Sequence, residues 1–247
     1  MRVMLRVAYD GTAYSGWQIQ QNAVTVEQRL KEALEELFAA PIELTGASRT
    51  DAGVHARGNV AVFDVDTRMP AEKIAYALNT RLPEDIRVVR SSEAAPDFHP
   101  RYAECVKTYE YKIWNAEFPD PTVRLYSHFE YRHLDAERMN EAARFLVGEH
   151  DFTSFCSAGA QVQSKVRTVY SAEVWRDGPM ITVRVTGNGF LYNMVRIIAG
   201  TLIKAGHDII LPDGVKKALD GRDRGLAGPT APARGLTLVK IDYGENG

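Results

Sequence analysis

Residues 47–56, with the sequence ASRTDAGVHA, hold the side chains best suited to chemistry. They offer one carboxylate, Asp51, with Arg49 shortly before it and His55 shortly after it. A carboxylate can act as a nucleophile, and a neighbouring cation stabilises its charged form. The small residues between the polar ones leave room for a ligand to approach the backbone. Residue type alone leaves a simpler alternative open, in which Asp51 is a solvated turn residue that pairs with Arg49 at the surface.

The sequence of the first part of the chain predicts the strands and helices that would position residues 47–56. Apolar patterning predicts strands over residues 2–9, 42–47, 59–65 and 86–90. Two helices are expected between them. The first begins at Thr25, which forms a capping-box pattern with Gln28, and it ends at Pro41. The second follows Pro70. The resulting order, β-α-β-β-α-β, is that of the ferredoxin-like split motif.

The second part of the chain repeats this mixture less regularly. Strands are expected over residues 107–114, 169–176, 180–185 and 236–243, and helices over 135–148, 195–206 and 215–219. Asp177 and Gly178 predict a hairpin turn, which Pro179 lengthens or distorts. We therefore predict an α+β protein with two ferredoxin-like α/β halves, residues 1–100 and 101–247. Their antiparallel sheets are expected side by side, with the helices packed behind and a central cleft.

Composition narrows the class of protein further. The 30 basic and 32 acidic residues give a formal net charge of −2, so any nucleic acid must meet a local positive patch rather than the summed field. Cys105 and Cys156 form no CxxC pair and no histidine spacing suggests zinc, so we expect reduced thiols and no metal. The sequence shows no signal-peptide core and no apolar stretch of about 20 residues. A cytoplasmic protein without membrane contact is therefore expected.

The motif RTDAGVHA, residues 49–56, closely resembles the active-site motif of the tRNA pseudouridine synthase A (TruA) family. Ser48 stands where that family usually has glycine. Other segments resemble the family's motifs in the family's order: residues 9–18 (YDGTxYxGWQ), 79–86 (Nx₂LPxDI), 97–101 (DFHxR), 109–111 (YxY), 148–155 (GxHDFxxF), 190–196 (FxxxMVR) and 232–236 (PAxGL). The resemblance extends over nearly the whole chain.

The resemblance implies a role for each candidate residue. Asp51 would be the catalytic nucleophile and Arg196 its basic partner. Tyr109 would stack on the target uracil, and Arg49 would help to hold the RNA in its flipped state. The family also contacts tRNA around residues 159–163 and through the segment that contains Phe98, His99, Arg101 and Tyr102.

The implied reaction converts uridine to pseudouridine at positions 38, 39 and 40 of the tRNA anticodon stem-loop. The N1–C1′ bond breaks, the base rotates, and a C5–C1′ bond forms, so no atom is lost and no redox change occurs. No small-molecule cofactor is therefore expected. Asp51 would attack either C1′ of the ribose or C6 of the ring, and the sequence leaves both open. Flipping the base costs a few kcal/mol, of which stacking on Tyr109 recovers about 1–3 kcal/mol. The family also implies a homodimer.

Three other functions remain possible from the residues. A noncatalytic RNA-binding module would fit a ferredoxin-like sheet, but it gives the Asp51 motif no purpose. A hydrolase acting on a glycosidic bond needs two cooperating acids, whereas the motif supplies one carboxylate and two basic neighbours. The third alternative keeps the isomerisation and changes the substrate to another RNA.

Overall fold

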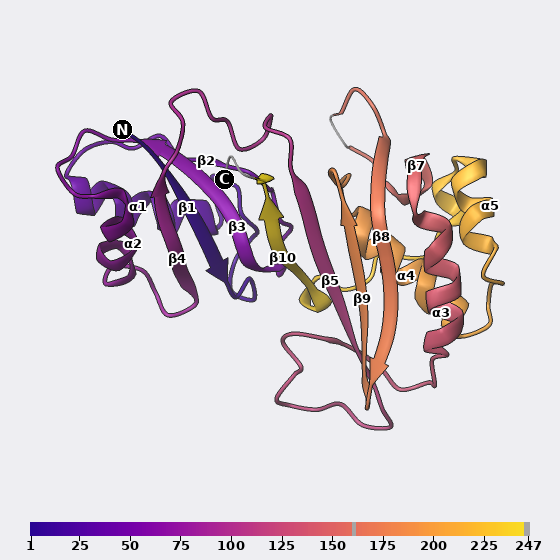
Figure 1. Ribbon diagram of the computed structural model, residues 1–247. Coiled ribbons are helices and arrows are strands. Elements are labelled where there is room, and N and C mark those ends of the chain that lie inside the picture. Colours follow the sequence, from indigo (N-terminus) through magenta and orange to yellow (C-terminus); the bar gives the residue numbers. More distant parts are fainter. Residues whose placement is uncertain (160–161, 245–247) are drawn as a thin grey trace. The chain divides into compact units, whose positions relative to one another are not determined.

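The computed structural model describes residues 1–159 and 162–244 (Figure 1). The chain forms two compact units. Unit 1 contains Met1–Cys105 and the residues from Leu238 onward, and unit 2 contains Val106–Thr237. Each unit combines helices with strands, which confirms the predicted α+β class.

Unit 1 contains the elements in the predicted order: β1 (Arg2–Tyr9), α1 (Val26–Phe38), β2 (Thr45–Gly46), β3 (His55–Asp64), α2 (Ala71–Asn79) and β4 (Ile86–Glu93). Its strands follow the order β4-β1-β3, with β2 also paired to β3, and all these pairs are antiparallel. This is the strand order of a ferredoxin-like split motif. The final strand, β10 (Leu236–Asp242), also neighbours β3.

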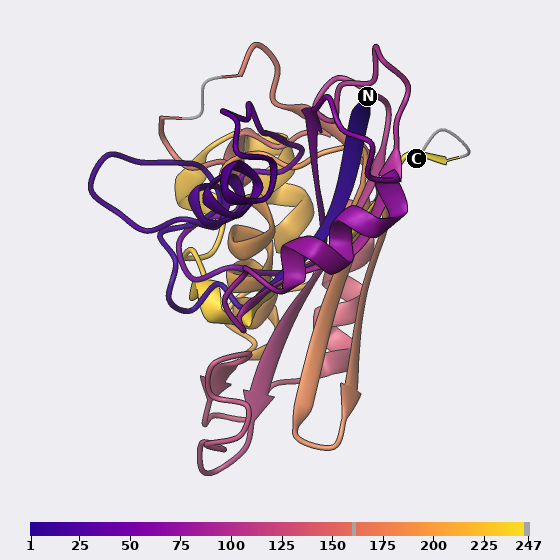
Figure 2. The same cartoon turned by 90° about the vertical axis from the view of Figure 1, so that its left-hand side faces the viewer.

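One face of the unit 1 sheet is buried under the two helices (Figures 1 and 2). Val3, Leu5, Val7 and Tyr9 alternate with partly exposed residues along β1 and are fully or almost fully buried. At the start of α1, Thr25 accepts a hydrogen bond from the Gln28 N–H. The Gln28 side chain donates to Glu32 instead of returning to Thr25, so only half of the predicted capping box forms.

Unit 2 contains β5 (Val106–Asn115), β6 (His128–Glu130), α3 (Ala136–Ala143), β7 (Gly148–Asp151), β8 (Val166–Asp177), β9 (Met180–Gly187), α4 (Met194–Gly206) and α5 (Gly214–Gly221). The antiparallel strands follow the order β5-β9-β8-β7, and β6 runs parallel to β5. The two short strands β6 and β7 were not predicted. Figure 1 shows the helices of this unit gathered on one side of β8 and β9.

The segment 42–47 was expected to be a strand, but only Thr45–Gly46 pairs with β3. The hairpin predicted at Asp177 and Gly178 forms between β8 and β9. Because Asp177 pairs with Met180, Pro179 is one of two turn residues and does not lengthen the turn. Gly178 has φ 54°, a left-handed backbone that glycine adopts without strain.

In the part of the chain that the structure describes, no helix is long and apolar enough to span a membrane.

Candidate active site

Asp51 lies in a tight turn between β2 and β3. The Val54 N–H donates to the Asp51 carbonyl at 3.1 Å. Thr50 and Val54 are buried, whereas Asp51 is partly exposed and Arg49 is exposed. The turn therefore presents a carboxylate and a guanidinium from a backbone whose flanking residues are fixed in the interior.

The segment 9–18 forms the support for this turn. The Trp17 N–H donates to the Thr50 carbonyl at 3.1 Å, and the Gly53 N–H donates to the Tyr14 carbonyl at 3.2 Å. Gly16 has φ +91°, and a Cβ atom there would lie 2.5 Å from the Thr50 carbonyl oxygen. Only glycine fits this backbone and this close approach. The two motifs nearest the N-terminus are thus one packed structure.

A buried polar network fixes the residues before Asp51. The Asn59 side chain bonds both backbone groups of Ser48: Oδ1 accepts from the N–H at 3.3 Å, and Nδ2 donates to the carbonyl at 3.0 Å. Nδ2 also lies 3.4 Å from the Tyr9 hydroxyl, which shares a 2.7 Å hydrogen bond with the Thr50 hydroxyl. All four residues are buried. Ser48 has no left-handed backbone, so serine replaces the family's usual glycine without strain.

His55, the second basic neighbour of Asp51, has a structural place. It is buried, and its Nδ1 accepts from the Gly11 N–H at 3.1 Å. The same nitrogen lies 3.1 Å from Asp10 Oδ1. His55 therefore joins the start of β3 to the segment 9–18. Sequence reasoning placed His55 near the chemistry but did not identify this role, nor the supporting roles of Tyr9 and Asn59.

Tyr109 and Tyr111 lie on the same face of β5, as strand alternation predicts. Tyr111 is fully buried, and its hydroxyl donates to the Pro232 carbonyl at 2.9 Å. Burial raises the pKa of the Tyr111 phenol well above its usual value, although the Arg196 and Arg234 charges act in the opposite direction. Tyr111 is a neutral core residue. Tyr109 is 8% exposed, and its ring meets Phe190 edge to face at a centroid distance of 5.2 Å.

Arg196 lies in the first turn of α4. Its Nε donates to the Ala231 carbonyl at 2.7 Å, and its Nη1 donates to Asn193 Oδ1 at 2.9 Å. The head group is therefore held by specific partners in unit 2 and does not simply extend to solvent. Most of α4 is buried, including Gly200, where a side chain would collide with the Pro229 carbonyl. Tyr109 and Arg196 belong to unit 2, whereas Asp51 and Arg49 belong to unit 1.

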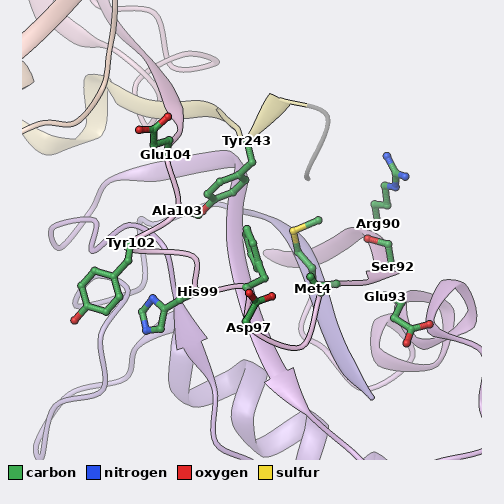
Figure 3. A pocket seen from close by; sticks show the side chains of 13 residues that line it. Met4, Arg90, Ser92, Glu93, Asp97, His99, Tyr102, Ala103, Glu104 and Tyr243 are labelled. Carbon is green, nitrogen blue, oxygen red and sulfur yellow. The ribbon is translucent and has the colours of Figure 1, made fainter.

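The four predicted RNA contacts follow β4. Phe98, His99 and Tyr102 line a pocket of about 900 Å³ in unit 1, in which Figure 3 labels His99 and Tyr102. Phe98 is 9% exposed and packs against Tyr243, with ring centroids 5.0 Å apart. Arg101 donates through Nε to the Gly46 carbonyl at 2.8 Å, which ties this segment to β2. His99 and Tyr102 stack with centroids 4.3 Å apart, and Tyr102 is 83% exposed. Of these aromatic side chains, that of Tyr102 is exposed and that of Phe98 is buried.

The remaining candidates give less information. Residues 160 and 161 of the predicted RNA-binding segment 159–163 lie outside the described residues. Among residues 1–159 and 162–244, no group of three or more His, Cys, Asp or Glu side chains could hold a metal ion. Cys156 is buried and Cys105 is partly buried, and both are free thiols.

Comparison with known proteins identifies relatives over almost the whole chain. The sequence pattern of the tRNA pseudouridine synthase family matches residues 6–103 and 142–244. A "tRNA pseudouridine synthase A" of Thermoanaerobacter sp. (strain X514) is 47% identical over 242 residues, covering 98% of this chain and 99% of that protein. The protein of the same name in Bacillus subtilis (strain 168) is 45% identical over 246 residues, with the same coverage. "tRNA pseudouridine synthase A 2" of Clostridium perfringens (strain 13 / Type A) is 41% identical over 241 residues, again with that coverage.

Among solved structures, a "Cbf5-Nop10-Gar1 Complex" aligns with 82% of this chain and 54% of that chain. The TM-score is 0.33 and the sequence identity 12%. A likeness at this level adds nothing to the family assignment.

Proposed function

Because this chain belongs to the tRNA pseudouridine synthases, a family of isomerases, we propose that it isomerises uridines 38, 39 and 40 of the tRNA anticodon stem-loop. Asp51 is the nucleophile in this proposal. The observation that carries it is the turn around Asp51. The Thr50 and Ser48 positions are fixed by buried partners, while the carboxylate is partly exposed.

Such a turn suits covalent catalysis on a large substrate. A nucleophile must be held within about 0.5 Å of its productive position. A rigid support removes the need to order it during the reaction. The supporting atoms come from β1, β3 and the segment 9–18, so the position of Asp51 is set by the folding of unit 1. The exposed Arg49 beside it is available to a phosphate or a flipped nucleotide.

The proposed chemistry is balanced without an added reactant. If Asp51 attacks C1′, it displaces N1, the free base rotates, and C5 then displaces Asp51 from C1′ as the C5–C1′ bond forms. If Asp51 adds to C6, the N1–C1′ bond breaks, the base rotates while bonded to Asp51, the C5–C1′ bond forms, and the Asp51–C6 bond then breaks. In both routes the proton on C5 leaves, N1 gains a proton, and the Asp51 carboxylate is regenerated. Substrate and product have the same atoms and oxidation state, so neither a metal nor a cofactor is required by the balance.

Tyr109 would act on the uracil base, and Arg196 would act on the charge of the Asp51 carboxylate. Tyr109 stacks on the flipped uracil, and its hydroxyl is a candidate to help remove the C5 proton. Arg196 pairs with Asp51 through opposite charge. Tyr102, with His99 behind it, gives an exposed stacking surface for RNA (Figure 3). We further propose that the enzyme works in the cytoplasm as a homodimer.

The reaction and its sites can be tested together. An unmodified tRNA transcript carrying tritium at C5 of its uracils is incubated with the purified protein in the absence of any cofactor. We expect tritium release from the wild-type protein. Replacing the uridines at positions 38, 39 and 40 by cytidine, singly and together, should remove the label released at each site. Undiminished release from the triple replacement would show that the substrate positions lie elsewhere.

A further inference from the structure

Asn193 has two unusual features immediately before α4. Its backbone is left-handed, with φ 61° and ψ 7°. Asparagine tolerates this conformation better than most residues, but the conformation remains unfavourable. An asparagine at this N-cap position usually accepts a hydrogen bond from a backbone N–H of the first helical turn. The Asn193 side chain makes no such bond. It is engaged elsewhere.

The Asn193 side chain lies between Arg196 and Ser157. Its Oδ1 accepts from Arg196 Nη1 at 2.9 Å, and its Nδ2 donates to Ser157 Oγ at 3.0 Å. Chemistry fixes this orientation of the amide, because a guanidinium can only donate. Ser157 is held in turn, since its N–H donates to the Tyr192 carbonyl at 3.1 Å. The amide therefore connects Arg196 to an ordered part of unit 2.

A second contact holds the same guanidinium at another atom. Arg196 Nε donates to the Ala231 carbonyl at 2.7 Å, and the Ala231 N–H donates to the Arg196 carbonyl at 3.1 Å. An arginine side chain without such partners samples many rotamers. Bonds at two different nitrogen atoms define both the position and the plane of the guanidinium.

We infer that Asn193 is a positioning residue that orients the Arg196 guanidinium for its interaction with Asp51. This inference rests on the proposed role of Arg196. A neutral amide suits the task, because it accepts from the guanidinium without neutralising its charge. A carboxylate at this position would accept the same bond, but its negative charge would compete with Asp51. The left-handed backbone is then the conformation that turns the amide toward Arg196 instead of toward the helix N-terminus.

Two substitutions at Asn193 separate the role of the side-chain amide from that of the left-handed backbone. Asn193→Gly accepts the left-handed conformation and removes the amide. Asn193→Asp retains an acceptor and adds a charge. Asn188→Asp is the matched control, since it makes the same chemical change at an exposed position where Oδ1 accepts from the Thr168 N–H at 3.0 Å. Arg196→Gln removes the guanidinium itself.

The measurement is single-turnover tritium release at saturating tRNA, with tRNA affinity and thermal unfolding recorded for each protein. We expect Asn193→Gly and Asn193→Asp to react about 10- to 100-fold more slowly, with tRNA affinity and the unfolding midpoint close to those of the wild type. A loss of folded protein would instead lower the unfolding midpoint and the amount of tRNA bound. Asn188→Asp should behave as the wild type.

The possible outcomes distinguish the inference from the proposed function. A wild-type rate for both Asn193 variants, beside an inactive Arg196→Gln, would overturn the positioning role and leave the role of Arg196 intact. A wild-type rate for Arg196→Gln would contradict the proposed function of Arg196.

Discussion

The turn around Asp51 and the first turn of α4 each present one charged side chain, but they are supported differently. The Asp51 turn depends on Tyr9 and Asn59, which belong to two strands and are buried. Arg196 is held by Asn193, three residues before it, and by the Ala231 carbonyl, through bonds that are only partly buried. The support of the Asp51 turn is part of the core of unit 1. The support of Arg196 includes a local contact between two side chains of the same segment.

This difference determines what a substitution should change. A buried donor or acceptor that loses its partner keeps its desolvation cost, so the fold itself is destabilised. A partly buried group can replace a lost partner by water, so the fold is affected little while the guanidinium loses one of the bonds that orient it. We therefore expect stability and turnover to change together in the Asp51 turn and separately at α4.

The largest expected effect on stability is that of Asn59→Ala. It leaves the N–H and the carbonyl of Ser48 without their buried partner, and it should lower the free energy of unfolding by about 3 kcal/mol, measured by urea denaturation. Turnover should fall as well, because the Asp51 turn loses its support. Asn193→Gly should change the free energy of unfolding by less than about 1 kcal/mol.

Asn79 provides a control for this prediction within unit 1. Its side chain also bonds both backbone groups of one residue, Val88, at 2.9 and 2.8 Å, but away from the Asp51 turn. Asn79→Ala should therefore reduce stability and leave turnover of the folded protein unchanged. If Asn59→Ala and Asn79→Ala had the same effect on turnover, Asn59 would have no particular connection to the site.

A smaller effect is expected from Tyr9→Phe. The change removes one hydroxyl from the network and leaves the Thr50 hydroxyl without that partner, at a cost of about 1 kcal/mol. The ring itself remains packed near Trp17. Thermal unfolding should show a modest decrease in midpoint, and single-turnover release a decrease smaller than that of Asn59→Ala. The comparison of the two regions would be weakened if Tyr9→Phe reduced turnover without any loss of stability.

Most strands and helices of unit 1 could be predicted because the sequence patterns that specify them are local. The alternation in residues 2–9 and the cap at Thr25 each act within a few positions. The strand expected over residues 42–47 was too long because Ile42, the apolar residue at its start, is buried outside the strand. The short strands β6 and β7 contain too few residues to show a period.

The candidate site was predictable only in part, because sequence patterns reveal local features and do not reveal contacts between distant segments. The motif around Asp51 is continuous in sequence and marks its own position. Asn59 is visible as a polar residue in an apolar strand, but its partner Ser48 lies in a different segment. The left-handed backbone of Asn193 and its bond to Arg196 have no local pattern, because they depend on how the chain enters α4.

The central claim is that the Asp51 carboxylate performs the covalent step, and one substitution tests it most directly. Asp51→Asn keeps nearly the same side-chain size but removes the nucleophile. It is compared with Asp66→Asn, which makes the same change at an exposed position of unit 1. We predict no tritium release above background from Asp51→Asn, with tRNA still bound, and a normal rate from Asp66→Asn. Release at the wild-type rate from Asp51→Asn would contradict the account.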